Sequence, residues 1–173
     1  MSVQQEILAL IRDVPDYPQP GVLFKDITPL LDDSAAFHAV ITAMAAAAPD
    51  GVTKVAGLEA RGFLLAAPIA LALGVGVVPV RKSGKLPAET YAQTYDLEYG
   101  TATIEIHRDA LRPEDRVLIV DDVLATGGTA QAAASLVHKA GAEVSGLSVL
   151  MELGFLKGRE RLTDLNIHSL VTV

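Results

Sequence analysis

The sequence of 173 residues contains no cysteine and few basic residues. Without cysteine, disulfide bonds and thiolate metal sites are excluded. The 14 lysines and arginines are outnumbered by 21 aspartates and glutamates, so the formal net charge is -7. Because no block of lysines and arginines occurs, nucleic acids and anionic membrane surfaces are disfavoured as partners. A strongly anionic ligand must therefore be met by a few local cations or by a metal ion.

A long uninterrupted hydrophobic run is absent as well. The longest apolar stretch, residues 64–80, is broken by two prolines and two glycines, which favours a helix, a turn and a strand over a membrane span. Residues 1–13 lack the basic segment and the apolar core of a signal peptide. We therefore expect a cytoplasmic protein. Residues 1–173 are expected to form a single domain, which is long enough to bury a hydrophobic core.

Several catalytic and metal-binding patterns are also missing. No Gly-x-Ser-x-Gly segment and no Ser-His-Asp arrangement is present, so covalent hydrolase chemistry has no candidate. Gly62 is not followed by the Gly-Lys-Ser/Thr of a P-loop, and Gly74 and Gly76 precede a strand instead of opening a helix, so a dinucleotide fingerprint is absent too. The histidines show no metal-ligand spacing, and we interpret all of them as surface or packing residues: His38, His107, His138 and His168.

The most informative stretch, residues 117–134, reads VLIVDDVLATGGTAQAAA. Its first four apolar residues predict a strand that is buried on both faces of a parallel sheet and ends at Val120. Asp121 and Asp122 follow, then a loop of small and hydroxyl residues, then a helix that is expected to run to about Ala140. The stretch therefore predicts a strand, a loop and a helix.

The loop in this stretch, ATGGT, suits an anion. At the carboxyl end of a parallel strand, a loop that opens a helix presents unpaired N–H groups and the positive end of the helix dipole. Gly127 and Gly128 allow the backbone to approach a ligand closely because they lack a Cβ atom. The hydroxyls of Thr126 and Thr129 add hydrogen-bond donors for phosphate oxygens. The loop is therefore a candidate phosphate site.

The two acids before the loop would repel a phosphate if they faced it. Asp121 and Asp122 are therefore expected to face groups that need acceptors, namely ribose hydroxyls or a hydrated Mg²⁺ ion. Aspartate, threonine and glycine also build an ordinary turn with an N-cap, but this crossing contains more of them than a turn needs. The spacing therefore predicts a site for a ribose 5-phosphate.

A second buried strand is predicted at residues 54–58, and it leads into Glu59-Ala60-Arg61-Gly62 and a helix at residues 63–73. Here too the carboxyl end of a strand meets the start of a helix. Arg61 stands in this turn, so the turn offers a cation at the same edge of the sheet as the phosphate loop.

A third strand is predicted at residues 75–80, and Arg81 and Lys82 follow it, with Lys85 in the next turn. A solvated surface is the ordinary explanation for such residues, but at this edge of the sheet they are the cations that a pyrophosphate needs. Residues 83–100 are polar and without strong periodicity. A connection of this length within a compact domain is usually functional, and we expect a lid.

The remaining segments give simpler predictions. Residues 3–13 have the pattern of an amphipathic helix, and the prolines after them predict an ordered loop without regular structure around Leu23, Phe24 and Lys25. Phe24 is either a plug of the core, which is the commoner case, or an aromatic stacking surface. Ser34 is a plausible N-cap for the next helix. The further predictions are a returning hairpin arm at 101–107, a strand at 143–150, a short helix at 158–162 and a terminal strand at 167–173.

Residues 117–129 resemble the signature with which type I phosphoribosyltransferases bind 5-phosphoribosyl-1-pyrophosphate. The segments RKSGKLP at 81–87 and TYDLEYG at 94–100 narrow the resemblance to the adenine phosphoribosyltransferases of that family. The resemblance implies an α/β fold in which helices flank a central, mostly parallel sheet. It also implies an N-terminal hood at residues 1–33, which contributes to base binding, and a flexible hairpin lid at 83–100.

The implied reaction transfers the 5-phosphoribosyl group to adenine, which gives AMP and pyrophosphate in purine salvage. Mg²⁺ is the implied cofactor, and a homodimer is the implied assembly, with Arg81 or Lys85 as the residue that each subunit contributes near its partner's pyrophosphate. No direct metal ligand is implied, although Asp121 and Asp122 could hold the ion through water. The loop at Glu59 often contains a cis peptide bond before a residue other than proline in this family.

The resemblance also implies roles for individual residues. Candidate catalytic residues are Glu98, Arg61 and Lys82, with Tyr99 beside Glu98 in the lid. Candidate residues for the phosphoribosyl group are Asp121, Asp122, Ala125, Thr126, Gly127, Gly128 and Thr129. Candidate residues for the pyrophosphate are Glu59, Ala60, Arg61, Arg81, Lys82 and Lys85. Candidate residues for the base are Leu23, Phe24, Lys25 and Leu153. Two departures are visible, since Lys25 stands where the family usually has arginine, and Ala60 where some members have serine.

Two other functions are compatible with the same phosphate loops. A related enzyme for guanine or xanthine would differ mainly around Phe24 and Leu153. A non-catalytic regulator that binds the donor would need a basic face for RNA or DNA, and this acidic chain offers no such segment.

Overall fold

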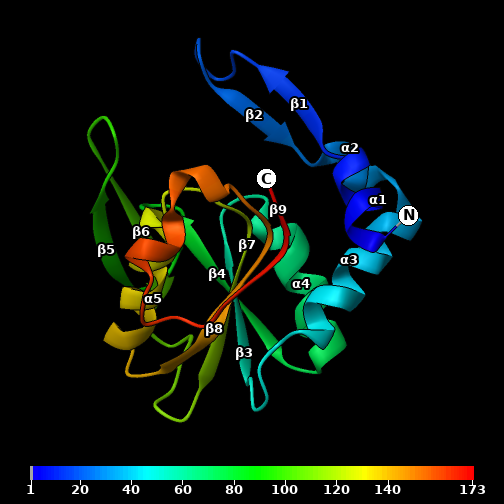
Figure 1. Cartoon of the computed structure of the whole chain (residues 1–173). Helices are drawn as coiled ribbons and strands as arrows, with labels where there is room; N and C mark the ends of the chain where they lie inside the picture. Colours follow the sequence, from blue (N-terminus) through cyan, green and yellow to red (C-terminus); the bar gives the residue numbers. More distant parts are fainter. Residues whose placement is uncertain (1) are drawn as a thin grey trace.

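The computed structural model describes residues 2–173, and helices flank a seven-stranded sheet at its centre (Figure 1). In spatial order the strands are β5 (Thr90–Asp96), β6 (Thr101–His107), β4 (Gly76–Lys82), β3 (Lys54–Leu58), β7 (Arg116–Leu124), β8 (Glu143–Glu152) and β9 (Ile167–Thr172). The strands from β4 to β9 are parallel, whereas β5 and β6 are antiparallel to their neighbours. This arrangement confirms the predicted α/β class with a mostly parallel sheet.

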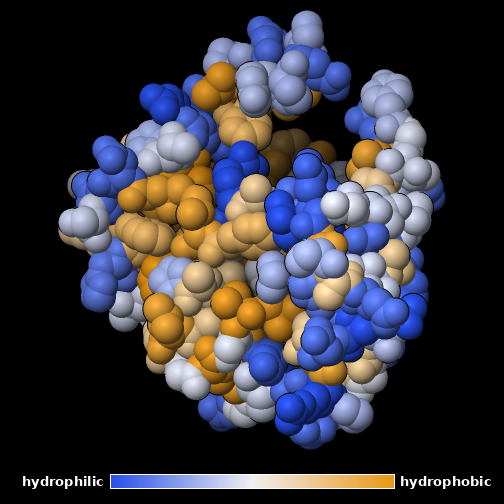
Figure 2. Space-filling view, turned by 180° about the vertical axis from the view of Figure 1, so that it is seen from behind, coloured by the Kyte–Doolittle hydropathy of each residue, from blue (hydrophilic) through white to orange (hydrophobic). Residues whose placement is uncertain are grey.

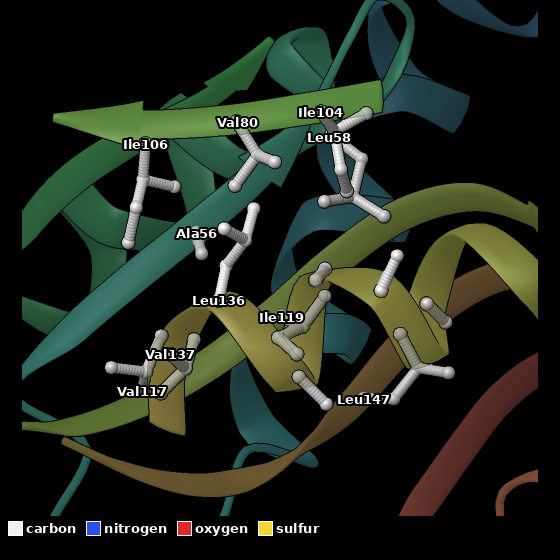
Figure 3. Packing of buried hydrophobic residues seen from close by; sticks show 14 of the residues in the cluster. Ala56, Leu58, Val80, Ile104, Ile106, Val117, Ile119, Leu136, Val137 and Leu147 are labelled. Atoms are coloured by element: carbon white, nitrogen blue, oxygen red, sulfur yellow. The ribbon is translucent and has the colours of Figure 1, made fainter. Parts of the chain in front are cut away.

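Two hydrophobic cores lie on opposite faces of this sheet. The helices are α1 (Val3–Ala9), α2 (Thr28–Asp32), α3 (Ser34–Ala46), α4 (Gly62–Leu73) and α5 (Gly128–Lys139). Leu136 of α5 belongs to one core together with Val117 and Ile119 (Figure 3). Leu118 and Val120 belong to the other core, with α3 and α4. Because successive side chains of a strand point to opposite faces, β7 divides its apolar run between the two cores.

The strand β7 is longer than the sequence pattern predicts. It continues past Val120 through both acids to Leu124, because its ladder with β8 extends as far as the pair Leu124 and Glu152. The prediction that the strand ends at Val120 was therefore wrong. Asp121 and Asp122 are residues of a paired strand, so the sheet fixes the direction of their side chains.

The predicted helix at residues 3–13 was also wrong in its second half. The helix α1 ends at Ala9, and a two-stranded hairpin follows, made of β1 (Arg12–Pro15) and β2 (Leu23–Asp26). The region around Leu23, Phe24 and Lys25 is therefore a strand and not an irregular loop. Pairing between the two strands overrides the local helical pattern and the nearby prolines.

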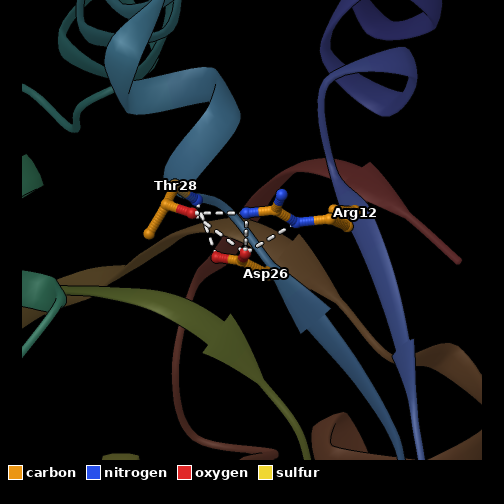
Figure 4. Close-up of polar contacts among 3 residues, drawn as sticks. All are labelled: Arg12, Asp26 and Thr28. Atoms are coloured by element: carbon orange, nitrogen blue, oxygen red, sulfur yellow. Dashed lines mark hydrogen bonds and ion pairs between the residues drawn. The ribbon is translucent and has the colours of Figure 1, made fainter.

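Polar side chains fix the base of this hairpin. The guanidinium of Arg12 donates to the carboxylate of Asp26, 2.8 Å from Nη2 to Oδ2, and to the hydroxyl of Thr28 (Figure 4). The next helix, α3, is capped by Asp33, whose carboxylate accepts from the N–H groups of Ala35 and Ala36. Ser34, the predicted N-cap, is instead the first residue of that helix.

The hairpin β1–β2 and the hairpin formed by β5 and β6 both lie on the side of the molecule where β9 ends (Figure 1). The 3-10 turns η1 (Gly154–Leu156) and η2 (Gly158–Arg161) follow β8. The strands predicted at 54–58 and 101–107 are confirmed as β3 and β6, and the terminal strand is confirmed as β9. Among residues 2–173, every helix is too short or too polar to cross a lipid bilayer.

Candidate active site

A cavity of about 840 Å³ opens at the carboxyl ends of the parallel strands, which is where ligands bind in open α/β sheets. The hairpin β1–β2, the turn after β3, the end of β7 and the turn after β8 all contribute to its wall. Among its lining residues are Leu23, Phe24, Lys25, Glu59, Ala60, Arg61, Lys82, Tyr95, Asp121, Asp122, Ala125, Thr129 and Leu153. Segments that are distant in the sequence therefore meet in one cavity.

The predicted phosphate loop forms a smaller pocket at one end of this cavity. Ala125, Thr126, Gly127, Gly128 and Thr129 all line it. Within the described residues, no side chain caps the first turn of α5, so the N–H groups there remain available for an anion. The first main-chain hydrogen bond of the helix runs from Gln131 N–H to the carbonyl of Gly127, at 3.0 Å.

The backbone of the phosphate loop needs glycine at position 127. Gly127 has a φ angle of 87°, and a Cβ atom there would lie 2.9 Å from the carbonyl oxygen of Gly158. At Gly128 a Cβ atom would meet only the flexible end of the Arg161 side chain, 3.0 Å from Nη1. Both approaches place the turn η2 directly behind the loop.

The two acids at the end of β7 have different environments. The side chain of Asp122 is buried and forms an ion pair with Nε of Arg61. The carboxylate of Asp121 accepts a hydrogen bond from the N–H of Asp122, at 2.8 Å. Burial, and then the neighbouring Asp122 carboxylate, raise the pKa of Asp121 well above its ordinary value. Arg61 thus pairs with one member of the pair, while the pKa of the other is raised.

Arg61 connects the two acids of β7 to the hairpin β1–β2. Its guanidinium carbon lies 4.9 Å from the centre of the Phe24 ring, which is a cation–π contact. The ring of Tyr17 also packs edge-on against the Phe24 ring, with 5.2 Å between the ring centres. Phe24 is half-buried at the cavity and belongs to neither hydrophobic core. The interpretation of Phe24 as a plug of the core was therefore wrong, and its ring is a surface of the cavity.

The turn after β3 is tied to the end of β4. The carboxylate of Glu59 accepts from the N–H of Lys82 at 2.8 Å and lies 3.4 Å from Nε of Arg81. The hydrogen bond from Lys82 is the main cause of a lowered pKa of Glu59, and the charge of Arg81 adds to it. The peptide bond between Glu59 and Ala60 is cis, as the family resemblance implies.

The predicted cations take different positions. Arg61 and Lys82 line the cavity, whereas Arg81 and Lys85 are not among its lining residues. Arg81 pairs with Glu59 and donates from Nη1 to the carbonyl of Lys85. The ammonium of Lys25 forms an ion pair with Asp13, at 2.6 Å.

The segment predicted as a lid, residues 83–100, contains β5, and the turn between β5 and β6 carries Glu98 and Tyr99. The side chain of Tyr99 is 78% exposed, and neither of these two residues lines the cavity. The strand β5 itself is tied to the neighbouring helix, because Lys139 Nζ donates to the carbonyl of Ala92 at 2.7 Å. The hydroxyls of Tyr95 and Thr129 share a hydrogen bond of 3.1 Å.

Three residues near the site were missed by the sequence analysis, namely Tyr17, Tyr95 and Arg161. Tyr95 lies in β5, where burial alternates along the strand. A strand predicted over residues 90–96 would have included it. Tyr17 lies in the turn before β2, and Arg161 lies in the turn after β8. Their approach to Phe24 and Gly128 follows from tertiary packing, so no local pattern indicates it.

The family model for the phosphoribosyl transferase domain matches residues 29–170. The adenine phosphoribosyltransferase of Nocardioides sp. is 63% identical over 97% of this chain and 94% of its own length. The crystal structure of adenine phosphoribosyltransferase from Thermoanaerobacter pseudethanolicus is similar with a TM-score of 0.95 and 51% identity, and it covers 99% of this chain and 100% of that chain.

A second solved structure shows a related protein with ligands. Adenine phosphoribosyltransferase from Saccharomyces cerevisiae, complexed with D-2,5-dideoxy-2,5-imino-altritol 1,6-bisphosphate and adenine, has a TM-score of 0.92 and 41% identity. The similarity covers 97% of this chain and 98% of the yeast chain.

Proposed function

This chain belongs to the phosphoribosyl transferase domain family, and from that premise we propose that it is an adenine phosphoribosyltransferase. It transfers the 5-phosphoribosyl group of 5-phosphoribosyl-1-pyrophosphate to adenine, and the products are AMP and pyrophosphate. Relatives of this name cover nearly the whole chain at more than 60% identity. The yeast relative was solved with adenine, which supports adenine as the base.

The observation that carries this proposal is the arrangement of one cavity with two unlike ends. The phosphate loop at the start of α5 lines a small pocket that shares Asp121, Ala125 and Thr129 with the cavity, and we call it the phosphate end. Phe24 and Leu153 line the cavity but not this pocket, and we call them the base end. Both acids of β7 line the cavity as well. A nucleoside 5-monophosphate has the same order of parts, with a phosphate, a ribose with hydroxyls and a flat base.

The reaction forms a bond between N9 of adenine and the anomeric carbon, and it breaks the bond between that carbon and the pyrophosphate oxygen. Because negative charge grows on the pyrophosphate, the main contribution of the protein is electrostatic. Arg61 and Lys82 line the cavity and can carry that contribution directly. In the turn after β3, the N–H of Glu59 already donates to the carbonyl of Val80, at 3.0 Å, so the N–H of Ala60 is the further donor for the leaving group.

Arg61 changes its partner during the reaction in this proposal. In the free protein its guanidinium pairs with Asp122 and covers part of Phe24. When the donor binds, the pyrophosphate competes for Arg61, and the Asp122 carboxylate becomes free to accept hydrogen bonds from the ribose hydroxyls. Asp121, whose pKa is raised by burial and by the neighbouring Asp122, supplies a second carboxyl group on the cavity wall.

Glu98 is the group that we propose for proton transfer at the base. In the described structure it lies in the exposed turn of the lid hairpin, outside the cavity. Closure of the lid would therefore have to bring Glu98, with Tyr99 beside it, toward the base. The same closure would exclude water, which would otherwise attack the ribosyl centre.

Mg²⁺ is the proposed cofactor. Within residues 2–173, no three histidine, cysteine, aspartate or glutamate side chains gather into a site that could hold a metal ion. The residues nevertheless fit an ion that keeps several waters and binds mainly to oxygens of the donor, since Asp121 and Asp122 offer carboxyl groups on the cavity wall. When bound there, the ion would neutralise charge on the pyrophosphate.

We propose a homodimer as the assembly. Support comes from apolar side chains that are exposed on α4 and β4, where Leu64, Leu71 and Val77 lie 51%, 82% and 46% exposed. Hydrophobic residues gather on the side of the molecule where α4 lies (Figure 2). Exposed apolar patches of this kind often mark interfaces. We also propose a cytoplasmic location, in keeping with purine salvage, and no nucleic-acid or membrane partner, in keeping with the net charge of -7.

One assay tests the proposed reaction. The protein is incubated with the donor and Mg²⁺, each nucleobase is added in turn, and the release of pyrophosphate is measured. We expect release with adenine. No release with any base would contradict the enzymatic function, and release with guanine or xanthine alone would assign the related activity. Donor binding without release would indicate a regulator.

A further inference from the structure

A charged cluster lies behind the cavity, where β8 ends. Glu152 is the last residue of β8 and is only 7% exposed. Both oxygens of its carboxylate accept from Nε of Arg159, at 2.8 and 2.9 Å, and Oε2 also accepts from the hydroxyl of Ser169, at 3.0 Å. A buried carboxylate requires such partners. We call Glu152, Arg159 and Ser169 the Glu152 cluster.

Arg159 extends the cluster to the last strand. Its Nη1 donates to the carbonyl of Ile167 and its Nη2 donates to the hydroxyl of Ser169, both at 3.2 Å. Arg159 therefore binds the end of β8 and two residues of β9 at once. The segment between Glu152 and Arg159 is a closed loop, and its two ends are held together by a charge-assisted contact.

Each end of this loop touches a different part of the cavity. Leu153 follows Glu152 directly and lines the base end, and its N–H donates to the carbonyl of Leu124 at 2.9 Å. Gly158 precedes Arg159 and packs on the phosphate loop so closely that a Cβ atom on it would collide with the carbonyl oxygen of Ala125. The Glu152 cluster is therefore one residue away from both the base end and the support of the phosphate loop.

We propose that the Glu152 cluster consists of positioning residues that fix the distance between the base end and the phosphate loop. None of its members lines the cavity, so they act through Leu153 and Gly158. The inference rests on the proposed function, because a fixed distance matters only for a ligand that spans both ends. AMP is such a ligand, whereas adenine and ribose 5-phosphate each occupy one end.

This difference between ligands separates positioning from simple stabilisation of the fold. We would measure binding of AMP, adenine and ribose 5-phosphate by titration calorimetry to the wild type and to Arg159→Lys. Lysine keeps the charge but loses the Nε that binds both carboxylate oxygens and the Nη groups that bind Ile167 and Ser169. We expect AMP to bind about tenfold more weakly, since a misplacement of about 1 Å can cost up to about 100-fold in a positioned reaction. Adenine and ribose 5-phosphate should each change by less than about twofold.

Two further variants make the result decisive. Arg116→Lys is the matched control, because Arg116 begins β7 at the end of the strand away from the cavity, and it should leave all three affinities unchanged. Ser169→Ala removes only the hydroxyl contacts with Arg159 and Glu152. It should weaken AMP binding in the same direction, so it decides the question if Arg159→Lys does not fold. Equal changes for the three ligands, or none, would overturn the positioning role. A wild type that forms no AMP from adenine and the donor would instead overturn the proposed function.

Discussion

The two ends of the cavity are built in different ways. The phosphate loop is a continuous segment between β7 and α5, and both of these elements are packed in a hydrophobic core. The base end combines Phe24 from the N-terminal hairpin with Leu153 from the C-terminal part of the chain. That hairpin has only two strands and is held by ion pairs at the surface, such as Arg12 with Asp26.

This difference affects rigidity and selectivity. A two-stranded hairpin is marginally stable by itself, and exposed ion pairs contribute little, about 0–1 kcal/mol each. The phosphate end is therefore preformed, while the Phe24 side of the base end can adjust. We conclude that donor recognition depends on backbone geometry, whereas the choice of base depends in part on Phe24, which a less stable hairpin carries.

The largest expected effect tests the backbone geometry of the phosphate end. Gly127→Ala forces a side chain onto a residue with a φ angle of 87° and brings its Cβ against the Gly158 carbonyl. We expect kcat/KM for the donor to fall about 100-fold or more, because the anion site would be displaced. Steady-state kinetics with varied donor would measure it.

The matched control for this variant is Gly141→Ala. Gly141 has a φ angle of 83°, but a Cβ atom there would meet open space beyond the end of α5. Both variants should lose about 1–2 kcal/mol of stability from the left-handed backbone. If Gly141→Ala impaired the kinetics as much as Gly127→Ala, backbone strain and not the site would be the cause.

The next effect concerns the wall between the two ends. In Asp122→Asn, Arg61 loses the partner with which it forms an ion pair, and the ribose hydroxyls lose a charged acceptor. We expect kcat to fall on the order of 10- to 100-fold, because a hydrogen bond to a charged group contributes about 1.5–3 kcal/mol. Asp115→Asn removes another buried aspartate, which binds Thr53, and it should reduce the thermal stability with little change in kcat. Full activity of Asp122→Asn would remove this acid from the site.

A smaller effect is expected at the base end. Phe24→Leu removes the aromatic surface, and a base stacked on an aromatic ring gains about 1–3 kcal/mol. We expect the KM for adenine to rise about tenfold while the KM for the donor stays within about twofold. Phe155→Leu is the control, because Phe155 is exposed and does not line the cavity. An equal rise of both KM values would show that the two ends are not independent.

The smallest effect is the acid sensitivity of the hairpin. The N–H of Thr28, and then the side chain of Arg12, lower the pKa of Asp26 to about 2 from 3.8. Because the pKa is lower in the folded state, the stabilisation is complete above pH 3.8 and is lost as the pH falls toward 2. We expect Asp26→Asn to flatten the decline in the free energy of unfolding over this interval, as measured by urea titrations at several pH values. An unchanged decline would show that other carboxylates cause it.

The sequence located the loop between β7 and α5 because the determinants of this loop are local. The apolar run of β7, the glycines and the threonines lie within a few turns of one another, so the loop at residues 125–129 could be located before any contact was known. The cis peptide bond before Ala60 followed from the resemblance. The strand end at Leu124 could not be located, since it depends on the length of the neighbouring β8.

The residues assigned to the base line the cavity, but the hairpin that carries Phe24 was not predicted. Phe24 and Leu153 were named from the resemblance, yet the hairpin that carries Phe24 depends on pairing between Arg12 and Asp26 across a turn. The contacts of Arg61 with both Phe24 and Asp122 join three distant segments. Such contacts arise from the packing of whole elements, and local propensity contains no information about them.

The hydrogen bond between Tyr95 and Thr129 couples phosphate binding to the hairpin of β5 and β6. Thr129 belongs to the phosphate loop, and Tyr95 belongs to the strand that leads to the lid turn. A threonine hydroxyl that donates to a bound phosphate can still accept from a tyrosine, and linked hydrogen bonds of this kind strengthen one another. By thermodynamic reciprocity, a phosphate that tightens this contact is itself bound more tightly when the contact is intact. Binding of 5-phosphoribosyl-1-pyrophosphate and docking of the hairpin are therefore coupled through the hydroxyl group of Thr129.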